Sequence, residues 1–102
     1  GGFEGSMSYA ASKGGVIAIT RGMASRLASE RITVNAVCPG TTATDILKGY
    51  TPEAVERQIN KIPMKRLGEP DEIAAAVCYL ASDEAAFVTG AMLDINGGAF
   101  IG

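Results

Sequence analysis

The chain has 102 residues, with no histidine, no tryptophan and only two cysteines. Without histidine, these residues cannot assemble a Ser-His-Asp or a Cys-His nucleophilic triad. Cys38 and Cys78 are too far apart in sequence for a CxxC redox pair or a zinc cluster, and we expect both to be ordinary buried thiols. The carboxylates are dispersed through expected helices, so no metal site is predicted. Tyrosine and lysine remain as the side chains available for proton transfer.

The sequence also lacks an excess of one charge and any long apolar run. Its net charge is −2 and its basic residues are scattered, so no basic stripe that would bind nucleic acid phosphates is present. No apolar run approaches the roughly 18 residues that span a bilayer, and the glycine-rich opening lacks the regions of a signal peptide. We therefore predict a globular, cytoplasmic chain with neither nucleic acid nor a membrane as a partner.

The most informative motif is Tyr9-Ala10-Ala11-Ser12-Lys13, at the expected start of a helix. A spacing of four residues places Tyr9 and Lys13 on one helix face. A nearby ammonium favours the phenolate and lowers the pKa of a tyrosine, so such a pair can exchange protons near neutral pH. The spacing arises by chance roughly one time in ten in a chain of this composition, and it also suits a packing tyrosine beside a solvated lysine. On spacing alone, both interpretations remain open.

Periodicity predicts a long first helix, over about residues 8 to 29. Val16, Ile19, Met23 and Leu27 recur at intervals of three and four, which is the periodicity of a helix. Its paired glycines, residues 14 and 15, cost about 1 kcal/mol each relative to alanine. This cost suggests a close approach to the backbone there, or tight helix packing.

Two strands and two further helices complete the expected elements. The strands cover residues 32–38, ended by Pro39-Gly40, and 91–95, closed by Asn96-Gly97-Gly98. Thr51 and Pro52 begin a helix that continues to about residue 61. Another helix runs from about residue 69 to 82. Its expected apolar face consists of Ile73, Val77 and Leu80.

The order of these elements predicts an α/β protein with helical crossovers. Only two strands are expected, and a two-stranded parallel sheet leaves both faces and an edge poorly covered. The sequence therefore indicates part of a larger sheet.

Four segments, in this order and spacing, resemble signatures of the short-chain dehydrogenase/reductase family. The segments are 9–15 (YAASKGG), 34–40 (VNAVCPG), 66–74 (RLGEPDEIA) and 94–98 (DINGG). The resemblance implies the C-terminal portion of a doubly wound parallel-sheet (Rossmann-like) fold, with two strands and three to four helices. By the same resemblance, residues 1–102 form the C-terminal catalytic half of a single domain, and its N-terminal cofactor-binding half is absent.

The resemblance implies an oxidoreductase that transfers a hydride between NAD or NADP and an alcohol or ketone. Tyr9 would be the general acid/base. Lys13 would bind the hydroxyls of the nicotinamide ribose and lower the pKa of Tyr9. A spacing of three residues between tyrosine and lysine argues, within this family, against the enoyl reductases. An arginine in place of the lysine would have indicated a dehalogenase.

The turn after the first strand would bind the nicotinamide. By the resemblance, the backbone at Pro39 and Gly40 lies against the ring, Thr42 meets the carboxamide through main-chain groups, and Thr44 contributes its hydroxyl. Ligands of open α/β sheets bind at the carboxyl ends of strands, which is where this turn lies. Position 42 holds threonine where many members of the family carry isoleucine or valine, so only its local packing is expected to differ.

The resemblance leaves two hypotheses of different class. The family's catalytic serine lies about a dozen residues before the tyrosine, which here falls before Gly1, and the glycine-rich pyrophosphate turn is missing too. The first hypothesis is part of an enzyme that is inactive by itself. The second is a noncatalytic module that keeps only self-association surfaces. The start at Gly1 without an initiator methionine favours the first. A homo-oligomer, dimer or tetramer, is expected through the helix over 69–82 and the strand over 91–95. The substrate is left open.

Overall fold

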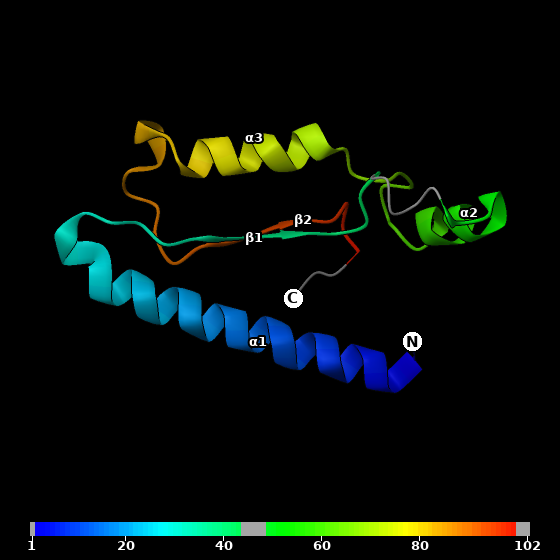
Figure 1. Ribbon diagram of the computed structural model, residues 1–102, viewed down its shortest axis with the longest axis horizontal. Helices are drawn as coiled ribbons and strands as arrows, with labels where there is room; N and C mark the ends of the chain where they lie inside the picture. Colours follow the sequence, from blue (N-terminus) through cyan, green and yellow to red (C-terminus); the bar gives the residue numbers. More distant parts are fainter. Residues whose placement is uncertain (1, 44–48, 100–102) are drawn as a thin grey trace. The chain divides into compact units, whose positions relative to one another are not determined.

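The computed structural model contains helices and strands in the order α1 (Gly2–Leu27), η1 (Ala28–Glu30), β1 (Ala36–Pro39), α2 (Pro52–Asn60), α3 (Pro70–Leu80), η3 (Asp83–Ala85) and β2 (Met92–Ile95) (Figure 1). It describes residues 2–43 and 49–99, with side chains from residue 10 onward. The chain divides into two compact units, one of residues 1–36 and 82–92 and one of residues 37–81 and 93–102. The predicted α/β class is confirmed.

The strands β1 and β2 pair side by side in a two-stranded sheet (Figure 1). The N–H of Ala36 donates to the carbonyl of Ala91 at 2.9 Å, and the N–H of Gly40 donates to the carbonyl of Ile95 at 2.8 Å. Donor and acceptor positions advance together along the two strands, so the pairing is parallel. The carboxyl ends of both strands therefore lie at the same edge of the sheet.

The strand predicted to begin at residue 32 begins at residue 36, because side chains interrupt the backbone pairing before it, where the N–H of Gly90 still donates to the carbonyl of Val34 at 2.7 Å. The N–H of Val34 donates to the hydroxyl of Thr89 at 3.0 Å. The Asn35 amide donates to the carbonyl of Val88 at 3.1 Å and accepts from the N–H of Ala91 at 2.9 Å. Asn35 thus occupies a donor and an acceptor of the neighbouring segment with its side chain rather than its backbone.

The helix α1 begins at Gly2, earlier than the predicted start near residue 8. Tyr9 therefore lies about two turns inside the helix rather than at its beginning. Glycine lowers helix propensity, but unlike proline it removes no backbone donor, so the glycine-rich opening does not prevent a helix.

Burial along α1 does not follow its apolar residues alone. Val16, Ile19 and Met23 are 45%, 65% and 47% exposed, whereas Thr20 and Ala24 are 6% and 3% exposed. Lys13, Ile17 and Leu27 are half-buried along the same line. The most buried residues on the packed side of this helix are therefore the small Thr20 and Ala24, and the larger Ile17 and Leu27 on that side are only half-buried.

The reason is a close approach by the segment before β2. Gly90 has φ of +77°, and a Cβ added there would lie 3.5 Å from the Cβ of Ala24 and 3.9 Å from the Cγ of Arg21. A larger side chain at residue 24 would meet this backbone. Helix α1 can pack so tightly here because Ala24 and Gly90 are both small.

The second unit is centred on the turn that follows β2. Ile62 is 4% exposed, and a Cβ added at Gly97 would lie 2.8 Å from its Cγ2 atom. The N–H of Met64 donates to the carbonyl of Gly97 at 3.0 Å. Gly97 and Gly98 have φ of +61° and +91°, a region that glycine enters without strain. The predicted closing turn thus also holds the segment that follows α2.

Helix α2 begins as predicted, because the hydroxyl of Thr51 accepts from the N–H of Ala54 at 3.1 Å and Pro52 takes the first helical position. In α3, the side chains that are half-buried are those of Ile73, Ala76 and Leu80.

One prediction about α3 is wrong, because Cys78 is exposed rather than buried, and Val77, on the predicted apolar face, is 50% exposed. A sheet of only two strands is narrow, so it covers few side chains of a helix that runs alongside it, and the others stay exposed. Cys38, the other thiol, is half-buried in β1.

Candidate active site

The first group of predicted site residues lies on α1. Tyr9, which the structure describes by its backbone, and Lys13 are one helical turn apart, or about 6 Å along the axis. Lys13 is half-buried and lies on the line that continues to the buried Thr20 and Ala24. Tyr9, four residues earlier, occupies a register position on that same face. Lys13 therefore belongs to the packed side of α1, and Tyr9 lies one helical turn before it.

The paired glycines after Lys13 remain unexplained by close contact. A Cβ added at Gly14 or Gly15 would meet nothing within 4 Å among the described residues. Both positions leave the backbone of α1 open on the side that they occupy.

The second group lies in the turn after β1. Gly40 donates its N–H to Ile95, and a Cβ at Gly40 would lie 2.9 Å from the Cα of Asn96. This distance is shorter than real Cβ contacts, so glycine is required here by the backbone that follows β2. The sequence pattern indicated a ligand contact at Pro39 and Gly40 but gave no sign of this packing role.

Beyond Gly40 the chain forms an isolated parallel bridge between Thr42 and Gly68. The N–H of Gly68 donates to the carbonyl of Thr41 at 3.0 Å, and the N–H of Ala43 donates to the carbonyl of Gly68 at 2.8 Å. Such a bridge uses the peptide groups on either side of Thr42, so the N–H and C=O of Thr42 itself face away from Gly68. Among residues 2–43 and 49–99, these two groups have no hydrogen-bond partner.

The side chain of Thr42 is engaged within the turn. Its hydroxyl donates to the carbonyl of Gly40 at 2.9 Å in a half-buried position. No sequence signal pointed to this bond. Thr44, the remaining predicted residue of this group, lies outside the described residues.

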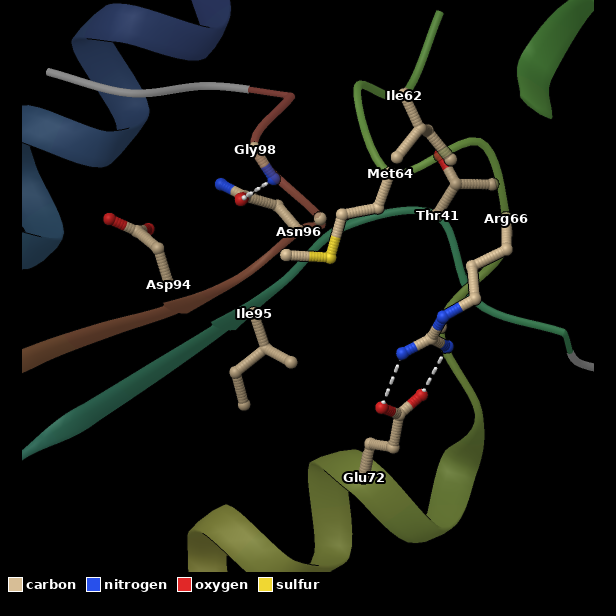
Figure 2. A pocket seen from close by; sticks show the side chains of 11 residues that line it. Thr41, Ile62, Met64, Arg66, Glu72, Asp94, Ile95, Asn96 and Gly98 are labelled. Carbon is tan, nitrogen blue, oxygen red and sulfur yellow. Dashed lines mark hydrogen bonds and ion pairs between the residues drawn. The ribbon is translucent and has the colours of Figure 1, made fainter. Parts of the chain in front are cut away.

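A cavity of about 350 Å³ lies on one side of this turn (Figure 2). Figure 2 shows the side chains of Thr41, Ile62 and Met64 around it, and the hydrogen bond from the N–H of Gly98 to the Asn96 side chain at 2.9 Å. Its other lining residues are Arg66, Gly68, Glu72, Asp94, Ile95 and Gly97.

Arg66 and Glu72 form the ion pair at the rim of this cavity (Figure 2). Two guanidinium nitrogens each donate to a carboxylate oxygen at 2.8 Å, and the N–H of Glu69 donates to the same carboxylate at 2.9 Å. The bonds from Arg66, then that from Glu69, lower the pKa of Glu72 to about 2, and the pair raises the pKa of Arg66. These bonds fix the start of α3, and the spacing of three residues between Glu69 and Glu72 could have indicated the bond from the N–H of Glu69.

A second, apolar hollow of about 420 Å³ is lined by Pro39, Thr42, Pro70, Ile73 and Ala74. Thr42 supplies its single polar side chain. Neighbouring residues of an extended segment point in opposite directions, which is why Thr41 lines the first cavity and Thr42 the second.

Two other classes of site are absent from the part of the chain that the structure describes. No group of three His, Cys, Asp or Glu side chains there comes close enough to hold a metal ion. No helix in that part combines the length and the apolar character needed to cross a bilayer.

Comparison with known proteins gives consistent similarities. Residues 1–99 match the family described as Enoyl-(Acyl carrier protein) reductase. The chain is 49% identical to acetoacetyl-CoA reductase of Shinella zoogloeoides over 98 residues, which are 94% of this chain and 40% of that protein. It is 46% identical over 100 residues to 3-oxoacyl-[acyl-carrier-protein] reductase of Vibrio cholerae, with 98% of this chain and 41% of that protein covered.

Among solved structures, it is similar to the 3-oxoacyl-[acyl-carrier protein] reductase of Brucella melitensis. The TM-score is 0.84 at 40% identity, and the match covers 92% of this chain and 35% of the other. The chain thus spans about two fifths of the length of the curated relatives that it matches.

Proposed function

The chain belongs to the short-chain dehydrogenase/reductase family, and on that basis we propose that the whole protein is an NAD(P)-dependent oxidoreductase that interconverts a ketone and an alcohol. Bound NAD(P)H would supply the hydride. We propose that residues 1–102 contribute two parts of the site: Tyr9 and Lys13 for the proton, and the turn residues Pro39, Gly40, Thr42 and Thr44 for the nicotinamide.

The observation that carries this proposal is the backbone of Thr42. Its N–H and C=O are a neighbouring donor and acceptor without a partner among the described residues. A primary amide presents one acceptor and two donor hydrogens, so the carboxamide of a nicotinamide complements this pair. The turn also follows the carboxyl end of β1, the edge at which open α/β sheets bind their ligands. The residues present therefore fit the group that the family implies.

Tyr9 would handle the proton. During reduction its hydroxyl donates a proton to the ketone oxygen as negative charge develops there, and during oxidation its phenolate takes the proton from the alcohol. Lys13, one turn along the same face of α1, favours the phenolate because opposite charges attract, and it would bind the ribose hydroxyls. The half-buried position of Lys13 strengthens this interaction, since partial exclusion of water lowers the effective dielectric constant.

For the substrate we propose a 3-oxoacyl thioester, because the relatives are named for the reduction of such compounds. The matched family is described instead by an enoyl reductase activity. The spacing of three residues between Tyr9 and Lys13 favours the ketone. Acetoacetyl-CoA, which carries a ketone, and crotonyl-CoA, which carries a carbon–carbon double bond, distinguish ketone reduction from enoyl reduction. We expect NADPH or NADH oxidation with the first and less than about a hundredth of that rate with the second, and the opposite order would contradict the ketone assignment.

The assignment of Tyr9 is tested by Tyr9→Phe in the whole protein, with Tyr79→Phe on α3 as the matched control. Tyr9→Phe should lower kcat by about a hundred- to ten-thousand-fold and leave the Kd for NADPH nearly unchanged, because only the transferable proton is lost. Tyr79→Phe removes the same hydroxyl elsewhere and should retain activity. A Tyr9→Phe enzyme with more than about a tenth of the wild-type rate would sink the assignment.

Lys13→Ala should weaken cofactor binding and also slow turnover, so that the Kd for NADPH rises and kcat falls. The reason is that the same ammonium would bind the ribose hydroxyls and stabilise the phenolate of Tyr9. A whole protein that binds neither NADH nor NADPH would favour the noncatalytic module instead.

We also propose that the whole protein is a homo-oligomer. Val77 on α3 is 50% exposed and Leu93 on β2 is 37% exposed, although both are apolar. An edge strand with an apolar side chain is a common pairing surface. Size-exclusion chromatography with light scattering tests this, and a clean monomer at micromolar concentration would contradict it.

A further inference from the structure

The peptide groups on both sides of Gly40 are held by hydrogen bonds of different origin. Its N–H donates to Ile95 in β2 at 2.8 Å, and its carbonyl accepts from the hydroxyl of Thr42 at 2.9 Å. The absence of room for a Cβ beside Asn96 removes further freedom. The pairing with β2 thus holds the N–H of Gly40, and the Thr42 side chain holds its carbonyl.

The surroundings of the Thr42 hydroxyl favour this bond over any other. The four remaining residues of the second hollow are Pro39, Pro70, Ile73 and Ala74, and none has a polar side chain. A hydroxyl beside apolar walls gains most from a partner within its own segment, because an unpaired polar group is costly there. The Gly40 carbonyl is the partner that the structure gives it.

We propose that Thr42 is a positioning residue whose hydroxyl locks the turn, so that its own N–H and C=O are already aligned for the carboxamide before the cofactor arrives. This inference rests on the proposed function, since it concerns the same nicotinamide contact. Ordering a loop during binding weakens affinity, so a turn ordered in advance binds more tightly. The side chain thus acts on cofactor affinity and not on the proton transfer at Tyr9.

The test compares Thr42→Val, Thr42→Ser and Thr41→Val in the whole protein. Valine has nearly the shape of threonine but no hydroxyl, and serine keeps the hydroxyl. Thr41 is the adjacent threonine, is also half-buried, and faces the first cavity. We expect Thr42→Val to raise the Kd for NADPH, or for NADH if that cofactor binds more tightly, about three- to tenfold. The loss in Thr42→Val should appear in the Kd more than in the kcat at saturating cofactor, and Thr42→Ser and Thr41→Val should bind as wild type does.

Hydrogen exchange without cofactor supplies a second readout. A peptide covering residues 36–43 should exchange about three- to tenfold faster in Thr42→Val, but not in Thr42→Ser or Thr41→Val. Equal exchange and equal Kd in Thr42→Val and wild type would overturn the positioning role and leave the proposed function standing. A different result would overturn the proposed function itself. If Thr42→Val exchanges faster than wild type but the wild-type whole protein binds neither NADH nor NADPH, then Thr42 has no role in cofactor binding.

Discussion

Asn35 offers the sharpest test of how the segment before β1 is held. Its side chain donates to the carbonyl of Val88 at 3.1 Å and accepts from the N–H of Ala91 at 2.9 Å. Asn35→Asp keeps the shape and the acceptor but removes the donor. At neutral pH a carboxylate oxygen would then face the carbonyl oxygen of Val88.

The expected cost follows from these two contacts. The lost hydrogen bond contributes about 0.5–1.5 kcal/mol, and a carbonyl left facing a carboxylate adds about 1–3 kcal/mol. The retained bond from Ala91 becomes charge-assisted and offsets part of this loss. Because the site is only half-buried, we expect Asn35→Asp to lower the free energy of unfolding by about 1–3 kcal/mol at pH 7.

The loss should depend on pH in a direction that identifies its cause. The protonated acid can donate to Val88, so folding raises the pKa of the introduced carboxyl above its unfolded value. The stability of the variant is then fully present below the unfolded pKa and falls as pH rises through the folded pKa, over roughly pH 4 to 6. Wild-type asparagine does not titrate in this range.

Urea unfolding of the whole protein, followed by circular dichroism at pH 4 and pH 7, measures both effects. Asn60→Asp, at an exposed position near the end of α2, introduces the same charge and should cost less than about 1 kcal/mol at pH 7. An Asn35→Asp variant within about 0.5 kcal/mol of wild type at pH 7, or one equally destabilised at both pH values, would refute the reasoning.

Three further outcomes are expected. Gly40→Ala should destabilise the whole protein by about 1–3 kcal/mol, because its Cβ would lie 2.9 Å from the Cα of Asn96, and calorimetry showing an unchanged Tm would contradict this. Thr51→Ala should cost about 1 kcal/mol by removing the cap of α2, measured by urea unfolding, with Thr51→Ser close to wild type. The carboxyl of Glu72 should titrate near pH 2 in an NMR titration, because its pKa is lowered to about 2. Its pairing with Arg66 is therefore fully present above the ordinary pKa of a glutamate and is lost as the pH falls toward 2. Arg66→Ala should move the titration midpoint of Glu72 upward, and an unchanged midpoint would exclude the ion pair as the cause.

The elements with explicit start signals were predictable from sequence. Thr51 followed by Pro52 defines the beginning of α2, and the strand before Asn96 was placed within one residue of β2. These signals are local, because a cap or a left-handed glycine acts on its own neighbours. The parallel pairing followed from the order of elements.

The packed side of α1 was not predictable in this way. The apolar periodicity draws attention to Val16, Ile19 and Met23, but these side chains are exposed. Contact with a segment distant in sequence buries Thr20 and Ala24 instead. The periodicity reports which residues are apolar, and close backbone approach selects small ones instead.

The candidate site was predictable in its residue types but not in its bonds. The Tyr9 and Lys13 spacing and the turn at Gly40 were visible in the sequence. The orientation of the N–H and C=O of Thr42 depends on its bridge to Gly68, a contact between residues far apart in the chain. The same holds for the Thr42 hydroxyl, whose bond requires the turn to be folded first.

The contact between Ala24 and Gly90 has a consequence for how the chain can vary. At position 90 a side chain would be strained by its positive φ and would also meet α1, and at position 24 growth is limited by the backbone that Gly90 brings close. The two positions therefore form one steric unit, and their substitutions are expected to show epistasis. A bulkier residue at position 24 would become acceptable only after the segment around residue 90 had moved or shortened, so evolution or a designed library must change the two segments together.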